Sequence, residues 1–271
     1  MIPKEEEIVE DLEHLSNDIV NWIRTYAIKN NINTLVVGVS GGIDSAVTST
    51  LCSKTQLRTI VLNLPIHQKK SQDNLARKHI EWLKLNWGNV ESKDIDLSGT
   101  YDFLMNNDLK EQKISDLALA NTRARLRMLT LYAIAASNGG IVVGTGNKIE
   151  DFGVGFFTKY GDGGVDISPI ADLYKSEVFA LGNFLGINQE IQEVPPTDGL
   201  WDDGRTDEDQ MGATYEELEW AMSEMESGCK NDLTPRQKEV LDIYSRLHAI
   251  NSHKMNLIPV FKKRDRTSME E

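Results

Sequence analysis

The chain has 271 residues, of which 40% are apolar and 26% are charged, a composition typical of a globular protein long enough to bury a sizeable core. Its formal net charge is −13, and its only run of cationic residues is Lys262-Lys263-Arg264. Because nucleic-acid binding draws its affinity from clusters of Lys and Arg, this charge argues against DNA or RNA as a partner, although a locally positive pocket could still hold a small anion.

The sequence offers no segment suited to insertion into a membrane. No run approaches the roughly 18 consecutive apolar residues that a membrane helix needs. The N-terminal residues MIPKEEEIVEDLEH are acidic and lack the apolar core of a signal peptide. We therefore expect a cytoplasmic protein with no membrane partner. Neither Cys52 nor Cys229 belongs to a CxxC pair, so both are expected to be buried and inert thiols.

The first half of the chain alternates helical and strand-like patterns. Apolar residues at spacings of three and four predict an amphipathic helix over residues 8–26. Short apolar runs predict strands over 34–39, 58–64, 90–96 and 141–145. Helices are predicted between the strands, over 45–53, 71–85 and 115–137. This alternation predicts an α/β fold, in which a doubly wound, mostly parallel sheet carries helices on both faces.

The pattern changes after residue 150. Residues 152–169 are rich in glycine and aromatic residues and show no clear periodicity, and residues 198–212 are polar and acidic. We expect 198–212 to be mobile, with a possible role as a lid over substrates. Helices are predicted over 215–225 and 235–251. The sequence thus predicts a single domain over residues 1–271, with a helical C-terminal extension.

A glycine-rich loop, Ser40-Gly-Gly-Ile-Asp-Ser45, lies between the first predicted strand and the helix after it. Ligands of open α/β sheets bind at the carboxyl ends of strands, and a helix N-terminus presents free N–H groups to phosphate. Asp44 would repel a phosphate unless a cation lay between them, which predicts Mg²⁺. The alternative is a simple βα turn with a capping serine, which the complete SGGxDS string disfavours. The loop is neither a Walker A loop nor a GxGxxG fingerprint.

The string GVSGGIDSAV resembles the pyrophosphate-binding loop of the N-type ATP pyrophosphatases, which cleave ATP between the α and β phosphates and form an adenylylated intermediate. Four later segments resemble, in the same order, the ammonia-dependent NAD synthetases of that superfamily: GTGNKIE (144–150), FFTKYGDGGVD (156–166), PIADLYK (169–175) and PPT (195–197). The resemblance covers nearly the whole chain. It implies an adenine-nucleotide α-hydrolase-like fold and a ligase that converts deamido-NAD, ATP and ammonia to NAD, AMP and pyrophosphate, the last step of NAD biosynthesis.

The resemblance also implies the site residues. Those for ATP are Gly38, Val39, Ser40, Gly41, Gly42, Ile43, Asp44, Ser45, Thr145, Lys175 and Thr197. Those for deamido-NAD are Arg125, Lys159, Asp166, His253 and Lys254. Asp44 and Glu150 would hold Mg²⁺. Lys175 and Asp44 would be catalytic, since Lys175 would neutralise phosphate charge in the transition state, and no side-chain nucleophile is expected.

Some of these residues could instead be ordinary surface residues. Glu150 alone would be an exposed loop acid, Lys175 alone a solvated lysine, and His253-Lys254 an exposed polar pair. At 100° per residue, Arg123 and Arg127 share a helix face and Arg125 points away from them, so we expect one functional arginine among the three. The chain also departs from some members of the family. It has GlyAsnLys after Thr145 where they have AspHisAla, and it has one extra residue between Glu150 and Phe156. The resemblance therefore does not determine the path of this loop.

Several partners and rival functions follow from the same comparison. The length and the absence of a cysteine-nucleophile motif imply no glutaminase domain, so free ammonia would be the substrate unless a separate glutaminase subunit exists. The family implies a homodimer, to which the apolar stripe of the opening helix could contribute. The rivals are another ATP-pyrophosphatase ligase, which the FTKYGDGG segment disfavours, and a non-catalytic nucleotide sensor. The presence of Asp44, Glu150 and Lys175 together disfavours the sensor.

Overall fold

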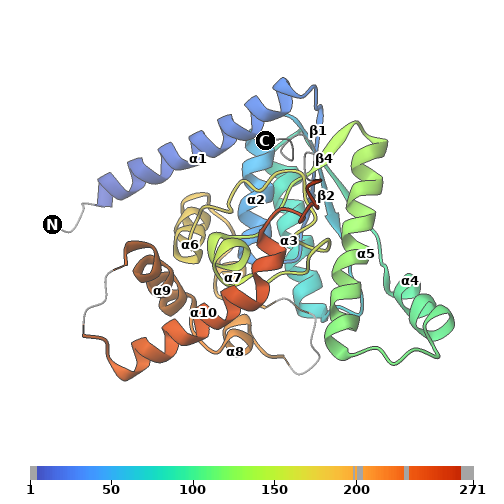
Figure 1. Cartoon of the computed structure of the whole chain (residues 1–271). Helices are drawn as coiled ribbons and strands as arrows, with labels where there is room; N and C mark the ends of the chain where they lie inside the picture. Colours follow the sequence, from blue (N-terminus) through green and yellow to red (C-terminus); the bar gives the residue numbers. More distant parts are fainter. Residues whose placement is uncertain (1–4, 198, 200–203, 229–231, 264–271) are drawn as a thin grey trace, which may run out of the picture.

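The molecule is built around a parallel β-sheet (Figure 1). The structure is a computed structural model and describes residues 5–197, 199, 204–228 and 232–263. Within them the sheet has the strand order β3-β2-β1-β4 and consists of β1 (Thr34–Gly38), β2 (Arg58–Asn63), β3 (Val90–Asp94) and β4 (Gly140–Val142). Val36 of β1 lies opposite Ile60 of β2 and Val142 of β4.

Helices cover both faces of the sheet, which explains why β1 and β2 are apolar along their length. Side chains alternate between the faces, so Leu35 and Val37 point one way and Val36 the other. The face of Leu35 and Val37 packs against α1 (Glu5–Lys29), α2 (Ile43–Lys54), α3 (Lys70–Asn86) and α6 (Lys175–Phe184). The face of Val36 packs against α4 (Ser98–Phe103) and α5 (Asp116–Ser137), and α4 runs on into a π-helical turn, η1 (Leu104–Asp108).

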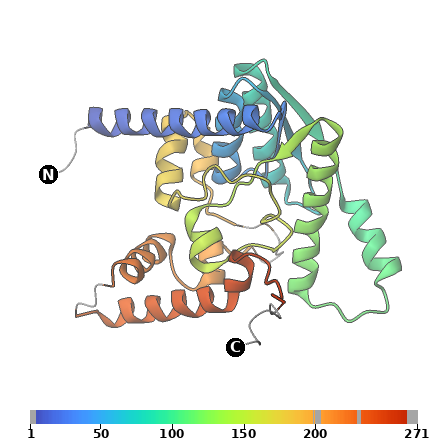
Figure 2. The same ribbon diagram turned by 45° about the horizontal axis from the view of Figure 1, so that its top comes forward.

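The C-terminal part of the chain forms a second layer away from the sheet (Figure 2). Its core joins a π-helical turn, η2 (Ile149–Val154), to α8 (Asp207–Met211), α9 (Tyr215–Ser227) and α10 (Pro235–Met255). A short helix, α7 (Gln189–Gln192), follows α6. Thr214 and Thr234 begin α9 and α10 with capping boxes, in which each threonine hydroxyl accepts a hydrogen bond from a backbone N–H of the first turn.

The predicted α/β fold with its parallel sheet and helical extension is confirmed. The predicted strands are present, but β3 and β4 are shorter than predicted. After β4, Val143 makes only an isolated bridge to Ile167. Cys52 is buried as expected, and burial raises the pKa of its thiol, whereas Cys229 lies outside the described residues. No helix among the described residues is both long enough and apolar enough to cross a bilayer.

Two sequence predictions need correction. Residues 207–211, expected to be mobile, form α8, where Thr206 caps the helix and Asp207 and Met211 are buried. Residues 198 and 200–203 of the same segment lie outside the described residues. Residues 152–169 were expected to be irregular, but residues 152–154 belong to the π-helical turn η2. A π-turn accommodates one residue more than an α-helical turn, and this one covers the loop whose path the sequence did not determine.

Candidate active site

A cavity of about 510 Å³ opens where the carboxyl ends of β1 and β4 meet. From β1 the chain proceeds to β2 and β3 on one side and returns to β4 on the other, so this point is where the strand order reverses. Such a reversal leaves a crevice between the loops that follow the two strands. All of the residues predicted to bind ATP line this cavity: Gly38, Val39, Ser40, Gly41, Gly42, Ile43, Asp44, Ser45, Thr145, Lys175 and Thr197.

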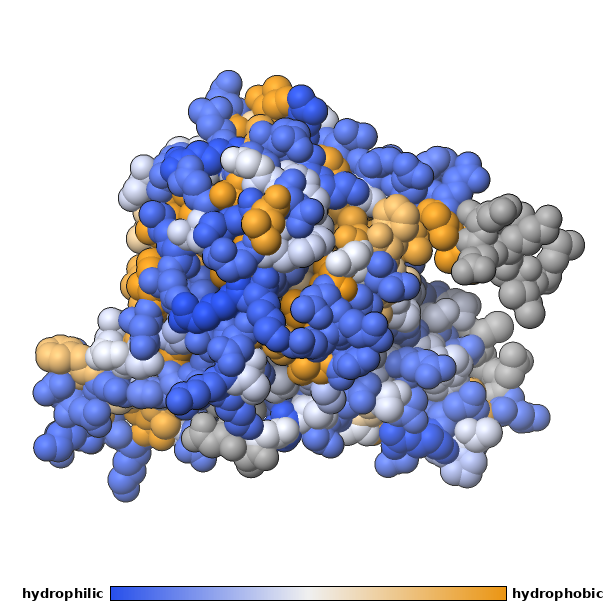
Figure 3. Space-filling view, turned by 180° about the vertical axis from the view of Figure 1, so that it is seen from behind, coloured by the Kyte–Doolittle hydropathy of each residue, from blue (hydrophilic) through white to orange (hydrophobic). Residues whose placement is uncertain are grey.

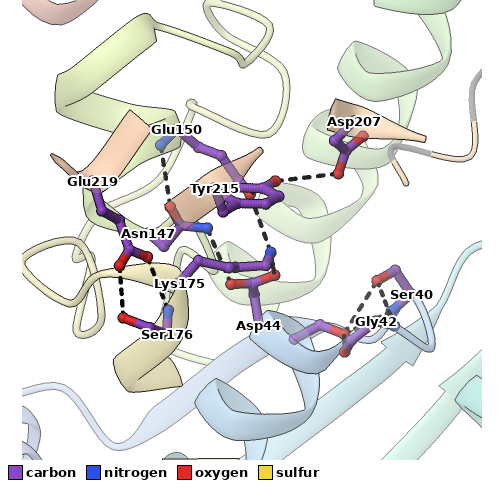
Figure 4. Close-up of polar contacts among 11 residues, drawn as sticks. Ser40, Gly42, Asp44, Asn147, Glu150, Lys175, Ser176, Asp207, Tyr215 and Glu219 are labelled. Carbon is purple, nitrogen blue, oxygen red and sulfur yellow. Dashed lines mark hydrogen bonds and ion pairs between the residues drawn. The ribbon is translucent and has the colours of Figure 1, made fainter. Parts of the chain in front are cut away.

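The glycine-rich loop is held in one shape by its two serines (Figure 4). The Ser45 hydroxyl donates to the Gly42 carbonyl at 3.0 Å, accepts from the Ser40 backbone N–H at 3.1 Å and lies 3.1 Å from the Ser40 hydroxyl. Gly41 has a φ of 88°, and a Cβ there would lie 2.7 Å from the Gln72 carbonyl oxygen, so only glycine fits. The loop therefore presents the N-terminus of α2 to the cavity, and helix N-termini are positions suited to anions.

Lys175, the first residue of α6, brings two carboxylates together beside this loop (Figure 4). Its Nζ lies 2.5 Å from Oδ2 of Asp44 and 3.2 Å from Oε1 of Glu150, and its side chain is only 3% exposed. Burial alone would lower the pKa of Lys175, but the charges of Asp44 and Glu150 raise it above its ordinary value. The lysine is therefore a buried permanent cation at the centre of the site.

Four residues that the sequence did not single out complete this arrangement. The Asn147 amide donates to Oδ1 of Asp44 at 3.2 Å, and its own oxygen accepts from the Glu150 backbone N–H at 3.1 Å. The Tyr215 hydroxyl donates to Oε1 of Glu150 at 2.6 Å and lies 3.4 Å from Oδ2 of Asp207. Glu219 accepts from the backbone N–H and hydroxyl of Ser176. Only Asn147 lies inside a recognised motif, and the other three come from distant parts of the chain.

Further acids surround the same point. Burial, with the neighbouring charges of Glu150 and Asp162, raises the pKa of Asp151 to about 8. Asp162 also lines the cavity, and desolvation raises the pKa of its carboxyl group. A raised pKa favours the neutral form of a carboxyl group, so Asp151 and Asp162 add less negative charge beside the buried lysine than two ordinary carboxylates would.

Asp44 and Glu150 fit a hard divalent cation by the chemistry of their donor atoms. Their carboxylates converge on one positive group, the Lys175 ammonium, so the fold already directs both toward a single cation position. No group of three or more His, Cys, Asp or Glu side chains arranged to hold a metal occurs among the described residues. The protein thus offers two carboxylates, the number that Mg²⁺ commonly takes when phosphates and water supply its remaining ligands.

The residues predicted to bind deamido-NAD separate into three places. Lys254 lines the cavity and donates to the carbonyls of Gly155 and Phe157, each at 2.8 Å. Arg125 is exposed and reaches the Lys159 carbonyl at 3.2 Å, while Lys159 Nζ lies 2.5 Å from the carbonyl of His253. Arg125, Lys159 and His253 therefore form a cluster, and none of the three lines the cavity.

Asp166 lies apart from this cluster, and both of its carboxylate oxygens accept hydrogen bonds from within the chain. One carboxylate oxygen accepts from the Tyr132 hydroxyl at 3.1 Å and the other from the backbone N–H of Val142 at 2.8 Å. It lines a separate surface hollow together with Trp22 and Tyr26, whose rings stack 6.1 Å apart. Its role in substrate binding stays a prediction.

Comparisons with known proteins find relatives that match most of this chain. The family model described as NAD synthase matches residues 15–257. The NH(3)-dependent NAD(+) synthetase of Alkaliphilus metalliredigens is 38% identical over 246 residues, which cover 89% of this chain and 95% of that protein. The solved structure of NMN synthetase from Francisella tularensis has a TM-score of 0.82 and 34% identity, covering 93% of this chain and 99% of the other.

A more distant structure shares the fold alone. The NH3-dependent NAD synthetase of Campylobacter jejuni has a TM-score of 0.75 at 23% identity, covering 93% of this chain and 99% of the other. The match to the family model spans both the sheet that carries the glycine-rich loop and the C-terminal layer that carries Tyr215. On the family model and the close relative together, this chain belongs to the NAD synthase family.

Proposed function

We propose that this chain is an ammonia-dependent NAD synthetase, which uses ATP to amidate the nicotinate carboxylate of deamido-NAD. The observation that carries the proposal is the buried contact of Lys175 with Asp44 and Glu150 beside a preformed phosphate loop. Membership of the NAD synthase family and the relatives named NH(3)-dependent NAD(+) synthetase support it. A protein that only sensed nucleotide would have no use for a buried cation between two acids.

ATP would lie with its phosphates at the glycine-rich loop. The N–H groups at the start of α2 and the Ser40 hydroxyl would bind the β and γ phosphates, which leave together as pyrophosphate. Thr145 and Thr197 line the cavity on its other sides, where they would contact the rest of the nucleotide. Lys175 would neutralise the charge that grows on pyrophosphate as it departs.

The proposed chemistry has two half-reactions. In the first, a carboxylate oxygen of deamido-NAD attacks the α phosphorus of ATP, the bond to the α,β-bridging oxygen breaks, and pyrophosphate leaves. In the second, ammonia attacks the carbonyl carbon, the bond to the AMP oxygen breaks, AMP leaves, and the nitrogen loses one proton to water. Neither step needs a side-chain nucleophile, so the chain would act by positioning the reactants and balancing charge.

Asp44 and Glu150 are the residues that would hold Mg²⁺. When bound, the ion would draw negative charge from the phosphate oxygens and orient them. Asn147 holds Asp44, and Tyr215 holds Glu150, so both carboxylates are fixed before any cation arrives. Lys175, which now contacts both acids, would share them with the ion.

The far end of deamido-NAD would contact residues at the rim of the site. Arg125, Lys159 and His253 form one group there, and Lys254 reaches into the cavity. Asp166 would contribute beside the hollow that contains Trp22 and Tyr26. These five contacts rest on the family resemblance, and alanine substitution of each should raise the KM for deamido-NAD more than the KM for ATP.

A homodimer is proposed on the same resemblance. In the space-filling view from behind, hydrophobic side chains gather along α1 beside its projecting N-terminal end (Figure 3). Trp22 and Tyr26 of this helix are 48% and 37% exposed although they are large and partly apolar. Sedimentation of the purified protein should therefore give twice the mass of one chain, and a monomer at micromolar concentration would refute the proposal.

A second candidate substrate is nicotinate mononucleotide. It is favoured by the likeness to NMN synthetase from Francisella tularensis, whose TM-score of 0.82 exceeds the 0.75 of the Campylobacter jejuni NAD synthetase. The reacting carboxylate is the same in both substrates, so the cavity around Lys175 would serve either one. The two substrates differ in that deamido-NAD carries an additional adenylate half, which would have to bind beyond the cavity around Lys175.

One assay tests both candidates. Purified protein is given Mg²⁺, ATP and ammonium with deamido-NAD, with nicotinate mononucleotide, or with an equimolar mixture, and the products are separated by chromatography. AMP and pyrophosphate with NAD as the main product support the first proposal, and nicotinamide mononucleotide as the main product supports the second. ADP and phosphate as nucleotide products would refute both.

A further inference from the structure

Helix α9 belongs to the C-terminal layer, yet two of its side chains reach the residues around the cavity (Figure 4). Tyr215 is its first residue and Glu219 follows one turn later, so both lie on the same face of the helix. Tyr215 contacts Glu150 and Lys175, and Glu219 contacts the residue after Lys175. One helix thus touches both sides of the contact between lysine and acid.

The Tyr215 hydroxyl fixes the orientation of the Glu150 carboxylate. It donates to Oε1 at 2.6 Å, the same oxygen that accepts from Lys175 at 3.2 Å. With one oxygen held by two donors, the carboxylate cannot rotate freely, and its second oxygen keeps a set direction.

The Tyr215 ring also limits where the lysine can lie. Lys175 Nζ is 4.7 Å from the ring centroid, within the range of a cation–π contact. The ammonium is therefore enclosed by Asp44, Glu150 and an aromatic face. A single side chain thus positions both the candidate metal ligand and the candidate catalytic lysine.

Glu219 fixes the start of α6, on which Lys175 is carried. Its two carboxylate oxygens accept from the Ser176 backbone N–H at 2.9 Å and from the Ser176 hydroxyl at 2.7 Å. This carboxylate serves one of the N–H groups that a helix N-terminus leaves unsatisfied, and it complements the helix dipole. The position of the Lys175 backbone is thereby tied to α9.

We propose that Tyr215 and Glu219 are positioning residues for the reaction, through which α9 sets the geometry of Glu150 and Lys175. The inference rests on the proposed function, because it assigns these residues to the adenylylation of the carboxylate by ATP. Neither residue touches the reacting atoms. Each acts through a residue that does, in the way that outer partners of metal ligands tune a site.

Tyr215→Phe tests the hydroxyl, and Tyr244→Phe is the matched control. Both tyrosines are buried in the same apolar cluster, but the Tyr244 hydroxyl makes no hydrogen bond to any described residue. The binding of ATP to each protein is titrated calorimetrically across Mg²⁺ concentrations, and kcat is measured separately. Tyr215→Phe should lose about 10- to 100-fold in Mg²⁺-dependent ATP affinity or in kcat, with Tyr244→Phe unchanged. Equal Mg²⁺ dependence and equal kcat in Tyr215→Phe and wild type would overturn the proposal.

Glu219 gives an independent test if Tyr215→Phe folds poorly. Glu219→Ala removes both acceptors of Ser176 and should lower kcat about tenfold, whereas Glu219→Gln keeps an oxygen for the backbone N–H and should recover most of that loss. Glu216→Ala, an exposed substitution on the same helix, is the control. An equal loss in Glu219→Ala and Glu219→Gln, or none in either, would count against positioning. Failure of the proposed function would appear instead as wild-type protein that forms no AMP.

Discussion

Removal of the Lys175 charge should destabilise the protein in a way that a divalent cation repairs. In Lys175→Met the carboxylates of Asp44 and Glu150, which are only 18% and 17% exposed, would face each other without a cation. Loss of one partner from a buried ion pair costs about 3–5 kcal/mol. In a chain of this length such a loss lowers Tm by about 6–20 °C. Mg²⁺ at 100 times its Kd would return about 2.7 kcal/mol.

The assay is thermal unfolding of wild type and Lys175→Met with EDTA and with Mg²⁺. Lys148→Met is the control, because Lys148 pairs at 3.3 Å with Asp172, whose side chain is 96% exposed, and such surface pairs contribute at most about 1 kcal/mol. Mg²⁺ should raise the Tm of Lys175→Met by several degrees more than it raises that of wild type or Lys148→Met. If EDTA leaves Lys175→Met as stable as wild type, or if Mg²⁺ stabilises all three proteins equally, the account of the buried lysine is refuted.

Three other predictions follow from single contacts. Asp44→Asn removes one charge from the cation position, so the Mg²⁺ concentration for half-maximal activity should rise about tenfold; wild-type activity at limiting Mg²⁺ would exclude Asp44 as a ligand. Burial lowers the pKa of His79 to about 4, so the folded state resists protonation below pH 6.5, and the free energy of unfolding should fall by up to about 3 kcal/mol between pH 6.5 and pH 4; urea titrations showing the same fall in His79→Gln would contradict this. Gly41→Ala should lower Tm and raise the KM for ATP, because the residue has a φ of 88° and the new Cβ would meet the Gln72 carbonyl. The control Gly42→Ala, whose Cβ would meet only the Ser40 hydroxyl at 3.5 Å, should keep the Tm of wild type. Equal Tm values for the two variants would argue against a strained loop.

The fold could be predicted where local pattern and tertiary environment agree. Strands buried on both faces are apolar along their whole length, so β1 and β2 were evident in the sequence. Helix α6 was missed because it begins after Tyr174, a residue with no strong preference for a helix start, and its cap is completed by Glu219 from another helix. Helix α8 was missed because its five residues are mostly acidic and its stability depends on the buried Asp207 and Met211.

The residues of the candidate site also divide into those that the sequence predicted and those that it did not. Residues inside contiguous motifs, such as Asp44 and Lys175, were assigned to the site from the sequence and line one cavity. Tyr215 was not, because it lies 65 residues from Glu150, and nothing in the sequence near it indicates which acid it will meet. The three arginines of α5 show what helix geometry can and cannot give. Arg125 does point away from Arg127, but Arg127 is the one that lines the cavity.

The two layers of the molecule are synthesised one after the other at the ribosome. A nascent chain that has emerged as far as Phe184 already contains the four described strands, along with Asp44, Glu150 and Lys175. Two further side chains are synthesised later: Tyr215 of α9, which contacts Glu150 and Lys175, and Lys254 near the end of α10, which lines the cavity. The strands of the sheet are therefore synthesised before part of the cavity lining exists. The lining of the cavity is therefore complete only once α10 has been synthesised, because Asn251 and Lys254 belong to that helix.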